Sequence, residues 1–330
     1  MPLLDASQPT AMSQAAQRLA DGELLSFPTE TVYGLGARAD DDAAVARIFA
    51  AKGRPSDHPL IVHAADSETA QAFAAHWPPS AQALARAFWP GPLTLIVPRT
   101  AGLANAAAGG HATIGLRVPG HPVAAELLQR AHALGVPGVA APSANRFGRI
   151  SATSAAHVVQ EFGEPLWVLD GGDCPGGIES TIVDCSRGAP VLLRPGAITR
   201  EQIEAACGET LRDQAQLGAP DPRASGTLEA HYAPNAKVRL MDAKALQAAL
   251  NVLGADAAHI AIWSRAALKT SSDRLHLRRM PDDAAATAQQ LFAVLREFDA
   301  QGAKLIWVEM PPMTSDWEGV RDRLQRAAAA

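Results

Sequence analysis

Short apolar runs bounded by turn residues recur through the first 195 residues of the chain, separated by segments of helical periodicity. Such runs are typical of strands in a partly or fully buried sheet. The expected strands are 60–63, 93–98, 114–119, 138–142, 166–170, 180–184 and 191–195. The spacing of apolar residues predicts helices over 10–20, 41–52 and 80–88. This alternation predicts an α/β fold, with a large N-terminal lobe in which helices flank a twisted mixed parallel and antiparallel sheet.

The pattern breaks between residues 209 and 235, where Gly, Pro, Ala and Asp occur without clear periodicity. This composition is typical of a linker, and the same segment could close over an active site as a lid. After it, strand-like runs alternate with helical segments at 242–253, 283–300 and 315–328. We therefore expect a domain over 1–208, a linker or lid over 209–235, and a smaller Rossmann-like α/β domain over 236–330.

Charge, cysteine spacing and hydropathy narrow the class of protein. The formal net charge is −5 at pH 7, whereas a protein that coats duplex nucleic acid needs a surplus of Lys and Arg. Cys174, Cys185 and Cys207 lack the spacing of a zinc site and the even count of a disulfide framework. No basic and apolar leader opens the chain, and no window of about 18 consecutive apolar residues occurs. We expect a cytoplasmic protein with reduced thiols, no membrane segment and no metal-ligand set.

The common P-loop, dinucleotide, esterase and zincin motifs are missing, so a bound nucleotide would need another cradle. One candidate is AAKGRPSDHPLIVH, residues 50–63, where Lys52 and Arg54 leave a helix end. In an extended segment the two cations would project to the same side and suit a polyanion. The alternative is that both complement a helix C-terminus in water. His58 and His63 would lie on opposite faces of a strand, which disfavours a shared metal.

A second candidate is APSANRFGRIS, residues 141–151, which follows a predicted buried strand. Ser143, Asn145 and Ser151 come after the carboxyl end of that strand, where open α/β sheets usually bind ligands. Hydroxyl and amide groups there could hold phosphate oxygens or a ribose. The alternative is a polar loop in which Ser151 or Thr153 caps the next helix.

Four further residues stand out by their place in apolar or featureless stretches. Arg117 lies inside a predicted strand, where a charge needs either a carboxylate-bearing substrate or a structural ion pair. Ser180 follows a glycine turn that is also compatible with a plain hairpin. Arg194 stands at a strand end, and Tyr232 lies in the expected linker, which seldom needs an aromatic residue.

A set of motifs occurs in a fixed order between about residues 11 and 235, namely FPTETVYGLG, KGRPSDHPL, FWPGPLTLI, GLRVP, APSANRFGRIS, ESTIVD, LLRPG and HYAP. This ordered set closely resembles the threonylcarbamoyl-AMP synthase family, in its long form with a C-terminal domain. The resemblance implies an adenylyltransferase that joins L-threonine, bicarbonate and ATP, with Mg²⁺ accompanying the ATP, and releases pyrophosphate. It also implies a role in forming threonylcarbamoyladenosine at position 37 of ANN-decoding tRNAs, with residues 1–208 as the catalytic domain.

By motif position, the resemblance implies three groups of site residues. L-threonine would be bound by Thr31, His63, Arg117, Ala141 and Ser180. ATP would be bound by Arg54, His58, Ser143, Ser151, Arg194 and Tyr232. The catalytic basic patch that serves bicarbonate and phosphates would comprise Lys52, Arg54 and Asn145. Thr31 stands beside an expected flexible turn at Tyr33-Gly34, which would let a small hydroxyl-bearing amino acid approach closely.

The sequence differs from the family pattern at one place, and it leaves two alternative functions to consider. Glu229 and Ala230 stand where long-form members often carry basic residues, which questions the lid's contribution to phosphate contacts. An RNA-binding module of the same fold would need a basic surface, which the acidic total disfavours. A carbamoyl transferase of hydrogenase maturation would also carry acylphosphatase and zinc-finger modules, and the sequence has no match to them. The expected partners are the three substrates and a downstream tRNA threonylcarbamoyl transferase, with direct tRNA binding weak or absent.

Overall fold

The computed structural model describes residues 3–163, 165–216 and 231–330. Two compact units divide the chain. The first takes Met1–Phe147 and Ser151–Thr227, and the second takes Gly148–Ile150 and Leu228–Ala330. Each unit has its own sheet.

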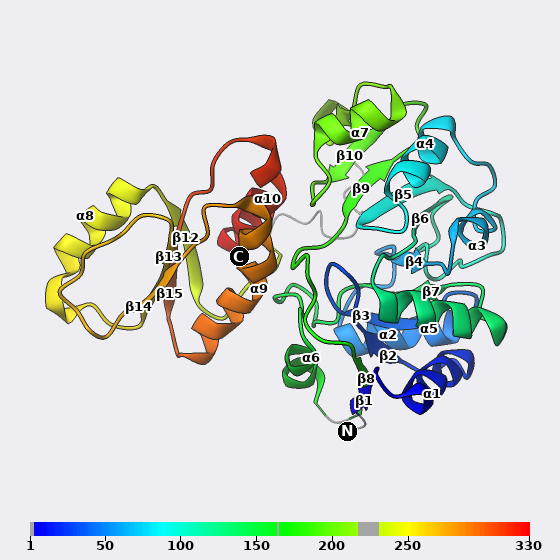
Figure 1. The fold of residues 1–330 in the computed structure, drawn as a ribbon, viewed down its shortest axis with the longest axis horizontal. Helices are drawn as coiled ribbons and strands as arrows, with labels where there is room; N and C mark the ends of the chain where they lie inside the picture. The colour runs from blue at the N-terminus through cyan, green and yellow to red at the C-terminus, as the bar shows by residue number, and fades with distance from the viewer. Residues whose placement is uncertain (1–2, 164, 217–230) are drawn as a thin grey trace. The chain divides into compact units, whose positions relative to one another are not determined.

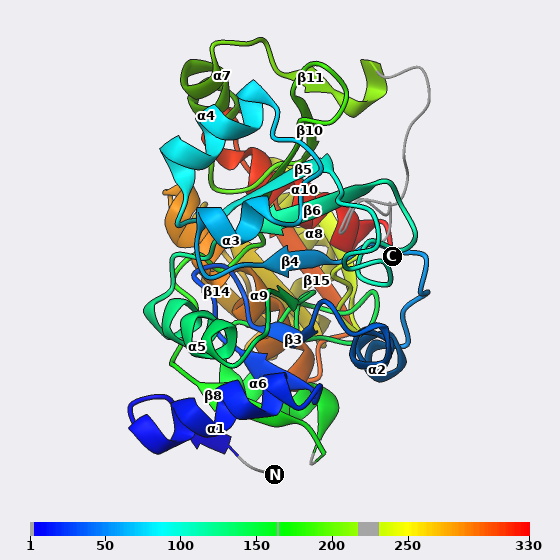
Figure 2. The same cartoon turned by 90° about the vertical axis from the view of Figure 1, so that its right-hand side faces the viewer.

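The first unit is built on an eleven-stranded sheet in the order β1-β8-β2-β3-β7-β4-β6-β5-β9-β10-β11, which Figure 2 shows from one side. Its strands are β1 (Leu3–Asp5), β2 (Leu25–Phe27), β3 (Gly34–Arg38), β4 (Ile61–His63), β5 (Leu93–Pro98), β6 (Thr113–Arg117), β7 (Val139–Ala140), β8 (Trp167–Asp170), β9 (Thr181–Asp184), β10 (Val191–Arg194) and β11 (Arg212–Asp213). The sheet contains both parallel pairs, such as β4 with β6, and antiparallel pairs, such as β5 with β6. The predicted α/β fold with a mixed sheet is confirmed.

Helices cover both faces of this sheet. They are α1 (Pro9–Ala20), α2 (Asp42–Lys52), α3 (Ser67–Gln71), α4 (Pro79–Phe88), α5 (Pro122–Ala133), α6 (Ala155–Phe162) and α7 (Arg200–Cys207). Val139 belongs to the buried cluster that contains α1 and α5, whereas Ala140 belongs to the larger cluster that contains α2 and α4. Successive strand residues point to opposite faces, so the two clusters lie on opposite sides of the sheet.

The stretch FPTETVYGLG does not form the flexible turn expected at Tyr33-Gly34. Gly34 opens β3, which pairs with β2 in an antiparallel hairpin, and Tyr33 is fully buried. A Cβ atom at Gly34 would lie 3.2 Å from the Cβ atom of Ala141. Glycine at this position therefore lets two backbone segments pack closely, and its role is steric rather than one of flexibility.

Part of the segment expected to be a linker belongs to the sheet. Arg212–Asp213 forms β11, which pairs in parallel with β10, and a short 3-10 helix over Gln214–Gln216 follows it. The sequence pattern missed β11 because two polar residues carry no strand periodicity. Residues 217–230, which include Glu229 and Ala230 of the expected lid, lie outside the described residues.

The second unit holds a four-stranded parallel sheet in the order β12-β15-β13-β14. Its strands are β12 (Lys237–Met241), β13 (Ile260–Ser264), β14 (His276–Arg279) and β15 (Leu305–Glu309). Helix α8 (Ala243–Leu253) lies on one side of the sheet, and α9 (Ala284–Ala300) and α10 (Glu318–Ala328) lie on the other, as Figure 1 shows. The 3-10 turns are Gly254–Asp256 and Ser315–Trp317. The predicted smaller α/β domain is confirmed as a helix-flanked parallel sheet.

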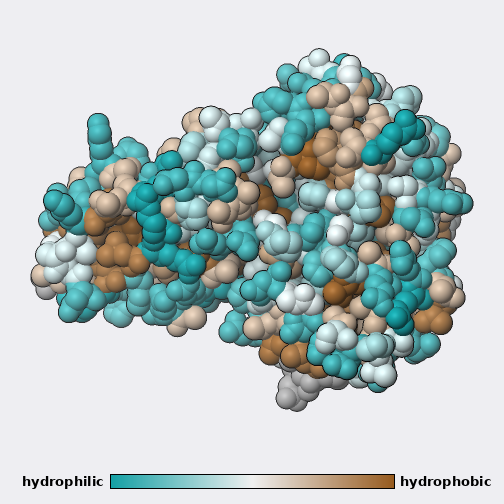
Figure 3. Space-filling model, in the orientation of Figure 1, coloured by the Kyte–Doolittle hydropathy of each residue, from teal (hydrophilic) through white to brown (hydrophobic). Residues whose placement is uncertain are grey.

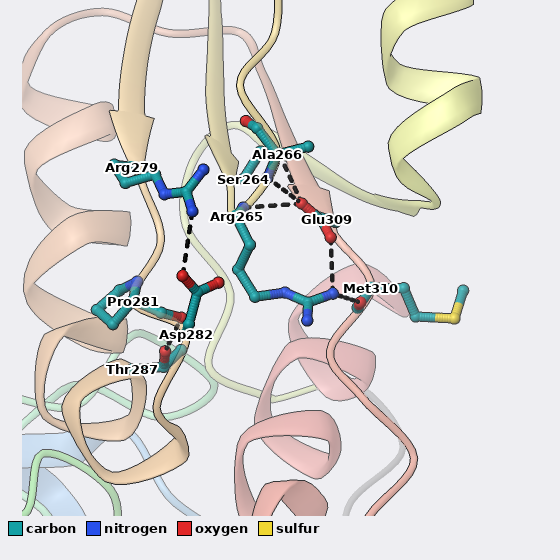
Figure 4. Close-up of polar contacts among 9 residues, drawn as sticks. All are labelled: Ser264, Arg265, Ala266, Arg279, Pro281, Asp282, Thr287, Glu309 and Met310. Atoms are coloured by element: carbon teal, nitrogen blue, oxygen red, sulfur yellow. Dashed lines mark hydrogen bonds and ion pairs between the residues drawn. The ribbon is translucent and has the colours of Figure 1, made fainter.

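A polar cluster joins the carboxyl ends of β13 and β15 (Figure 4). The Glu309 carboxylate accepts hydrogen bonds from Ser264 Oγ at 2.7 Å and from the backbone N–H of Ala266 at 2.9 Å. Its other oxygen lies 2.6 Å from Nη2 of Arg265. Burial favours the neutral acid, but these hydrogen bonds and the Arg265 charge outweigh burial and hold the pKa of Glu309 below its ordinary value. The cluster fixes the two loops that leave the sheet at this edge.

The surface drawn in Figure 3 is mostly hydrophilic, with small separate apolar areas. Leu277 and Met313 are among the few large apolar side chains that are exposed. Among the described residues, no helix combines the length and the hydropathy needed to cross a bilayer.

Candidate active site

Arg117 forms the centre of the predicted threonine-binding group. It ends β6 in register with His63 at the end of the parallel strand β4. Its Nη1 donates to Thr31 Oγ1 at 3.0 Å, its Nε donates to the Gly91 carbonyl at 3.3 Å, and its Nη2 lies 2.6 Å from Glu30 Oε1. A guanidinium group has five N–H donors, and the contacts with described residues use three of them. Arg117 thus has the structural ion pair that the sequence left open, together with two donors that no described residue occupies.

Glu30 is a partner of the predicted site residue Arg117 that sequence reasoning missed. Burial raises the pKa of its carboxyl, but the charge and hydrogen bonding of Arg117 outweigh this and hold the pKa below its ordinary value. The Arg117 guanidinium is thereby oriented toward Thr31 by a fixed negative partner. A lone arginine in an apolar strand was the available signal, because such a charge needs a negative partner, either from the chain or from a ligand.

His63 is buried, with its ring edge-on to Phe27 at 6.3 Å between centroids. Burial first, and then the nearby positive charge of Arg117, lower the pKa of His63 to about 3. The imidazole is therefore neutral at neutral pH. Ala141, which is also assigned to this group, follows the neighbouring strand β7, and its backbone N–H donates to the Ile61 carbonyl at 2.9 Å.

The depressed pKa of His63 predicts a loss of stability on acidification. Below pH 6.5 the unfolded chain binds a proton at His63 that the folded chain does not, so the free energy of unfolding falls as pH drops from 6.5 toward 3. The His63→Gln variant lacks this titration. Between pH 7.5 and 5.5, the wild type should lose about 1.4 kcal/mol more than the variant. Urea unfolding at the two pH values measures this difference, and parallel losses in both proteins would contradict the assignment.

Ser180 and Arg194 lie together at the edge of the sheet where β9 begins and β10 ends. Arg194 donates from Nε to the Ser180 carbonyl at 3.0 Å and from Nη2 to Ser180 Oγ at 3.2 Å. The Thr181 backbone N–H donates to the Pro92 carbonyl at 3.0 Å. Pro92 follows Gly91, the residue whose carbonyl accepts from Arg117. A single short segment therefore contacts both the Arg117 group and the Ser180 group.

Lys52 does not sit in water at the helix end, as the alternative view of the sequence held. Its side chain is 3% exposed, and Nζ donates to the Ser143 carbonyl at 2.7 Å and to the Asn145 carbonyl. Burial first, and then the charge of Arg54, lower the pKa of Lys52 well below its ordinary value. Lys52 therefore ties the end of α2 to the loop that carries two other predicted residues.

Arg54 and His58 gather around Phe147, which the sequence analysis did not single out. The Arg54 guanidinium carbon lies 5.9 Å from the centroid of the Phe147 ring, and the His58 ring lies 5.6 Å from it. Arg54 Nη2 also donates to the Pro59 carbonyl at 3.1 Å. The two cations do not project side by side from an extended segment, because Lys52 ends α2 and Gly53 turns the chain through a left-handed cap.

His58 lies in a turn before β4, so the strand-face argument against a histidine metal pair does not apply to it. In the parts of the chain that the structure describes, His, Cys, Asp and Glu form no group of three that could hold a metal ion.

Ser151 is buried and donates from Oγ to Glu179 Oε1 at 2.5 Å. Glu179 precedes Ser180 in the chain, so this bond places Ser151 beside the Ser180 group. Neither Ser151 nor Thr153 caps the next helix, because the N-cap of α6 is Ser154, which accepts from the backbone N–H of His157. Glu179 is a second carboxylate that sequence reasoning missed.

Tyr232 belongs to the second unit, whereas the other predicted site residues belong to the first. Its backbone is left-handed, with φ of 62°. Its ring is tilted against Phe292 at 5.3 Å between centroids, and the Arg323 guanidinium carbon lies 5.4 Å from its ring centroid. The structure thus brings the remaining predicted residues into one unit, but it groups Tyr232 with the core of the other unit.

Comparisons with known proteins give matches over most of the chain. The family model described as "Telomere recombination" matches residues 17–196, and that described as "Threonylcarbamoyl-AMP synthase, C-terminal domain" matches residues 198–329. The threonylcarbamoyl-AMP synthase of Pyrococcus abyssi is 36% identical, over 95% of this chain and 93% of its own, and that of Bacillus subtilis is 37% identical, over 96% and 92%. A solved structure of P. abyssi Sua5 complexed with L-threonine superimposes with a TM-score of 0.87 at 34% identity, and the match covers 97% of this chain and 95% of that one.

Proposed function

The chain belongs to the threonylcarbamoyl-AMP synthase family, and on this premise we propose that it joins L-threonine, bicarbonate and ATP into threonylcarbamoyl-AMP and releases pyrophosphate. The observation that carries the proposal is the linked set of contacts in the first unit. Thr31, Arg117, Ser180 and Arg194 come from distant parts of the sequence, yet they are joined through the Gly91-Pro92 segment. This set combines small hydroxyls and two arginines, as a site for an amino acid beside a nucleotide requires.

The proposed threonine-binding residues are Thr31, His63, Arg117, Ala141 and Ser180. Arg117 would bind the carboxylate with the donors that Thr31, Glu30 and Gly91 leave unused. The short side chains of Thr31 and Ser180 suit a small substrate, and specificity for threonine would come from paired hydrogen bonds rather than from bulk. His63 would take part as a neutral imidazole, because burial and the Arg117 charge disfavour its protonation.

The proposed ATP-binding residues are Arg54, His58, Ser143, Ser151, Arg194 and Tyr232, and the proposed catalytic residues are Lys52, Arg54 and Asn145. A carbamate formed from threonine and bicarbonate is short-lived in water, so the reaction needs a site that excludes solvent. Burial of Lys52, Asn145 and Ser151 supports such a site. A carbamate oxygen would then attack the α-phosphorus, while Arg54 and Arg194 offset charge on the departing pyrophosphate.

Lys52 would act mainly by holding the loop that carries Ser143 and Asn145. In its charged form the ammonium group has three donors, two of which the structure assigns to carbonyl oxygens. The third is available to an anion such as bicarbonate. Because burial lowers the pKa of Lys52, a bound anion would raise it again and favour the charged form.

Mg²⁺ would enter with the triphosphate rather than occupy a protein cage. The described residues provide no group of three His, Cys, Asp or Glu side chains for a cation, and Mg²⁺ commonly keeps several waters and binds substrate phosphates. We assign no step of the reaction to it. The proposed product would pass to a downstream tRNA threonylcarbamoyl transferase for modification of position 37 in ANN-decoding tRNAs, a role that places the protein in the cytoplasm. The RNA-binding alternative gains no support from the family to which the chain belongs.

The proposed reaction predicts a strict substrate requirement. Purified protein should release pyrophosphate from ATP only when both L-threonine and bicarbonate are present, since the attacking carbamate needs both. A coupled pyrophosphate assay with each component omitted in turn measures this. L-serine is the matched control, because it lacks only the methyl group. Equal turnover with serine, or none with threonine, would overturn the proposal.

A further inference from the structure

Thr94 is a buried threonine whose hydroxyl meets a proposed substrate-binding residue. It lies in β5, is fully buried, and places Oγ1 2.8 Å from Ser180 Oγ. Distance alone does not say which of the two hydroxyls donates. Within the described residues, Ser180 is the one hydrogen-bond partner of the Thr94 hydroxyl. Whichever hydroxyl donates, the other proton has no acceptor among the described residues, so burial alone does not decide the direction. An acceptor on the proposed substrate pairs both protons when Ser180 donates to the substrate and Thr94 donates to Ser180. With substrate bound, Thr94 must therefore be the donor.

Arg194 is the second hydrogen-bond donor to the Ser180 hydroxyl. A guanidinium group can only donate, and Nη2 of Arg194 lies 3.2 Å from Ser180 Oγ. In this substrate-bound arrangement Ser180 Oγ accepts from both Thr94 and Arg194. A serine hydroxyl has two acceptor sites and one proton, so both acceptor sites are filled, and no described residue accepts the proton. Ser180 then offers the substrate only a donor.

We propose that Thr94 is a positioning residue that fixes Ser180 as a hydrogen-bond donor toward an anionic oxygen of the substrate. This inference rests on the proposed function, in which Ser180 binds L-threonine. The positive charge of Arg194 beside Ser180 favours a charged acceptor over a neutral one. The threonine ammonium group cannot accept a hydrogen bond and the threonine hydroxyl is neutral, so we assign the acceptor to the carboxylate, or to the carbamate oxygen formed later. Thr94 itself does not touch the substrate in this arrangement.

The first test replaces Thr94 with valine, which keeps the branched shape and removes the donor. Ser180 would then lose the contact that sets its proton, and the dissociation constant for L-threonine should rise about tenfold in calorimetric titration. Thr94→Ser keeps a hydroxyl and should restore the wild-type value to within about twofold. If the valine variant does not fold, Thr94→Ala against Thr94→Ser gives the same comparison. A threonine affinity within twofold of wild type in the variant without the hydroxyl would overturn the proposal.

A matched control separates positioning from a general loss of stability. Thr287 is also a fully buried threonine, and its Oγ1 donates to the Pro281 carbonyl at 3.1 Å in the second unit, as Figure 4 shows. Thr287→Val should lower the melting temperature while threonine affinity stays within twofold of wild type. A tenfold loss of affinity in this control would mean that any buried hydroxyl has the same effect, and the proposal would fail.

A double-mutant cycle and a substrate analogue test the acceptor. In the Ser180→Ala background, Thr94→Val should weaken threonine binding by less than twofold, because its effect passes through Ser180. L-threoninamide lacks the carboxylate charge, so the tenfold effect of Thr94→Val should shrink with it. An undiminished effect in either arm would overturn the proposal. Wild-type protein without threonine-dependent pyrophosphate release would instead overturn the proposed function, so the two failures are distinguishable.

Discussion

Arg117→Ala is expected to lower the free energy of unfolding by about 3–5 kcal/mol, because it leaves the Glu30 carboxylate buried without its cation. Turnover should fall by about 100-fold or more, as is typical when a preorganised donor to a charged substrate is lost. Chemical unfolding and the pyrophosphate assay measure the two effects. Arg279→Ala is the matched control, because its pair with Asp282 is largely exposed. Exposed pairs contribute about 0–1 kcal/mol.

The pH dependence of the stability of Arg117→Ala tests whether the unpaired Glu30 carboxylate causes the loss. Without Arg117, burial raises the pKa of Glu30 above its ordinary value, so the folded protein takes up a proton more readily than the unfolded chain. A raised pKa of Glu30 adds stability at low pH that is lost as pH rises. The loss in free energy of unfolding of Arg117→Ala relative to the wild type should therefore be smaller at pH 5 than at pH 8. Adding Glu30→Gln should recover part of the stability at pH 8 but not the turnover. An equal deficit at both pH values would show that Glu30 is not the source.

Lys52→Ala is expected to remove both turnover and part of the stability. The helix-end position alone predicts little effect on folding, but the side chain is buried and donates to two carbonyl oxygens. Its removal leaves those acceptors and a cavity, at a cost of about 2–4 kcal/mol in the free energy of unfolding. Turnover should fall by about 100-fold because the loop with Ser143 and Asn145 loses its anchor. Urea unfolding and the pyrophosphate assay measure the two losses.

Arg54→Ala is the matched control for Lys52→Ala. Arg54 follows the same helix end but is only partly buried, and Nη2 makes a hydrogen bond to the Pro59 carbonyl. Its loss should change the free energy of unfolding by about 1 kcal/mol or less, while turnover falls. If Lys52→Ala is as stable as Arg54→Ala, the buried anchor inferred for Lys52 is wrong.

Local patterns predicted the elements that carry strong periodicity. Strands such as β5 and β9 and helices such as α2 and α9 were expected because their apolar spacing is visible within a short window. Strands with a weak local signal were not predicted. β3 reads GLGAR and has no β-branched or aromatic residue, and β11 has two polar residues. Both are strands because neighbouring segments pair with them, which a local window cannot reveal.

The sequence by itself determined the class of the fold, the residue types of the candidate site and the resemblance to a family, because each depends on short local motifs. The tertiary structure alone decided which side chains and carbonyl groups the buried polar residues contact. Thr31 and Arg117 are 86 positions apart, and so are Thr94 and Ser180, while Lys52 and Ser143 are 91 apart. A motif specifies that a buried arginine or lysine needs a partner, but not which one. That choice depends on strand order and register, which bring distant residues within hydrogen-bond distance only when the whole sheet forms.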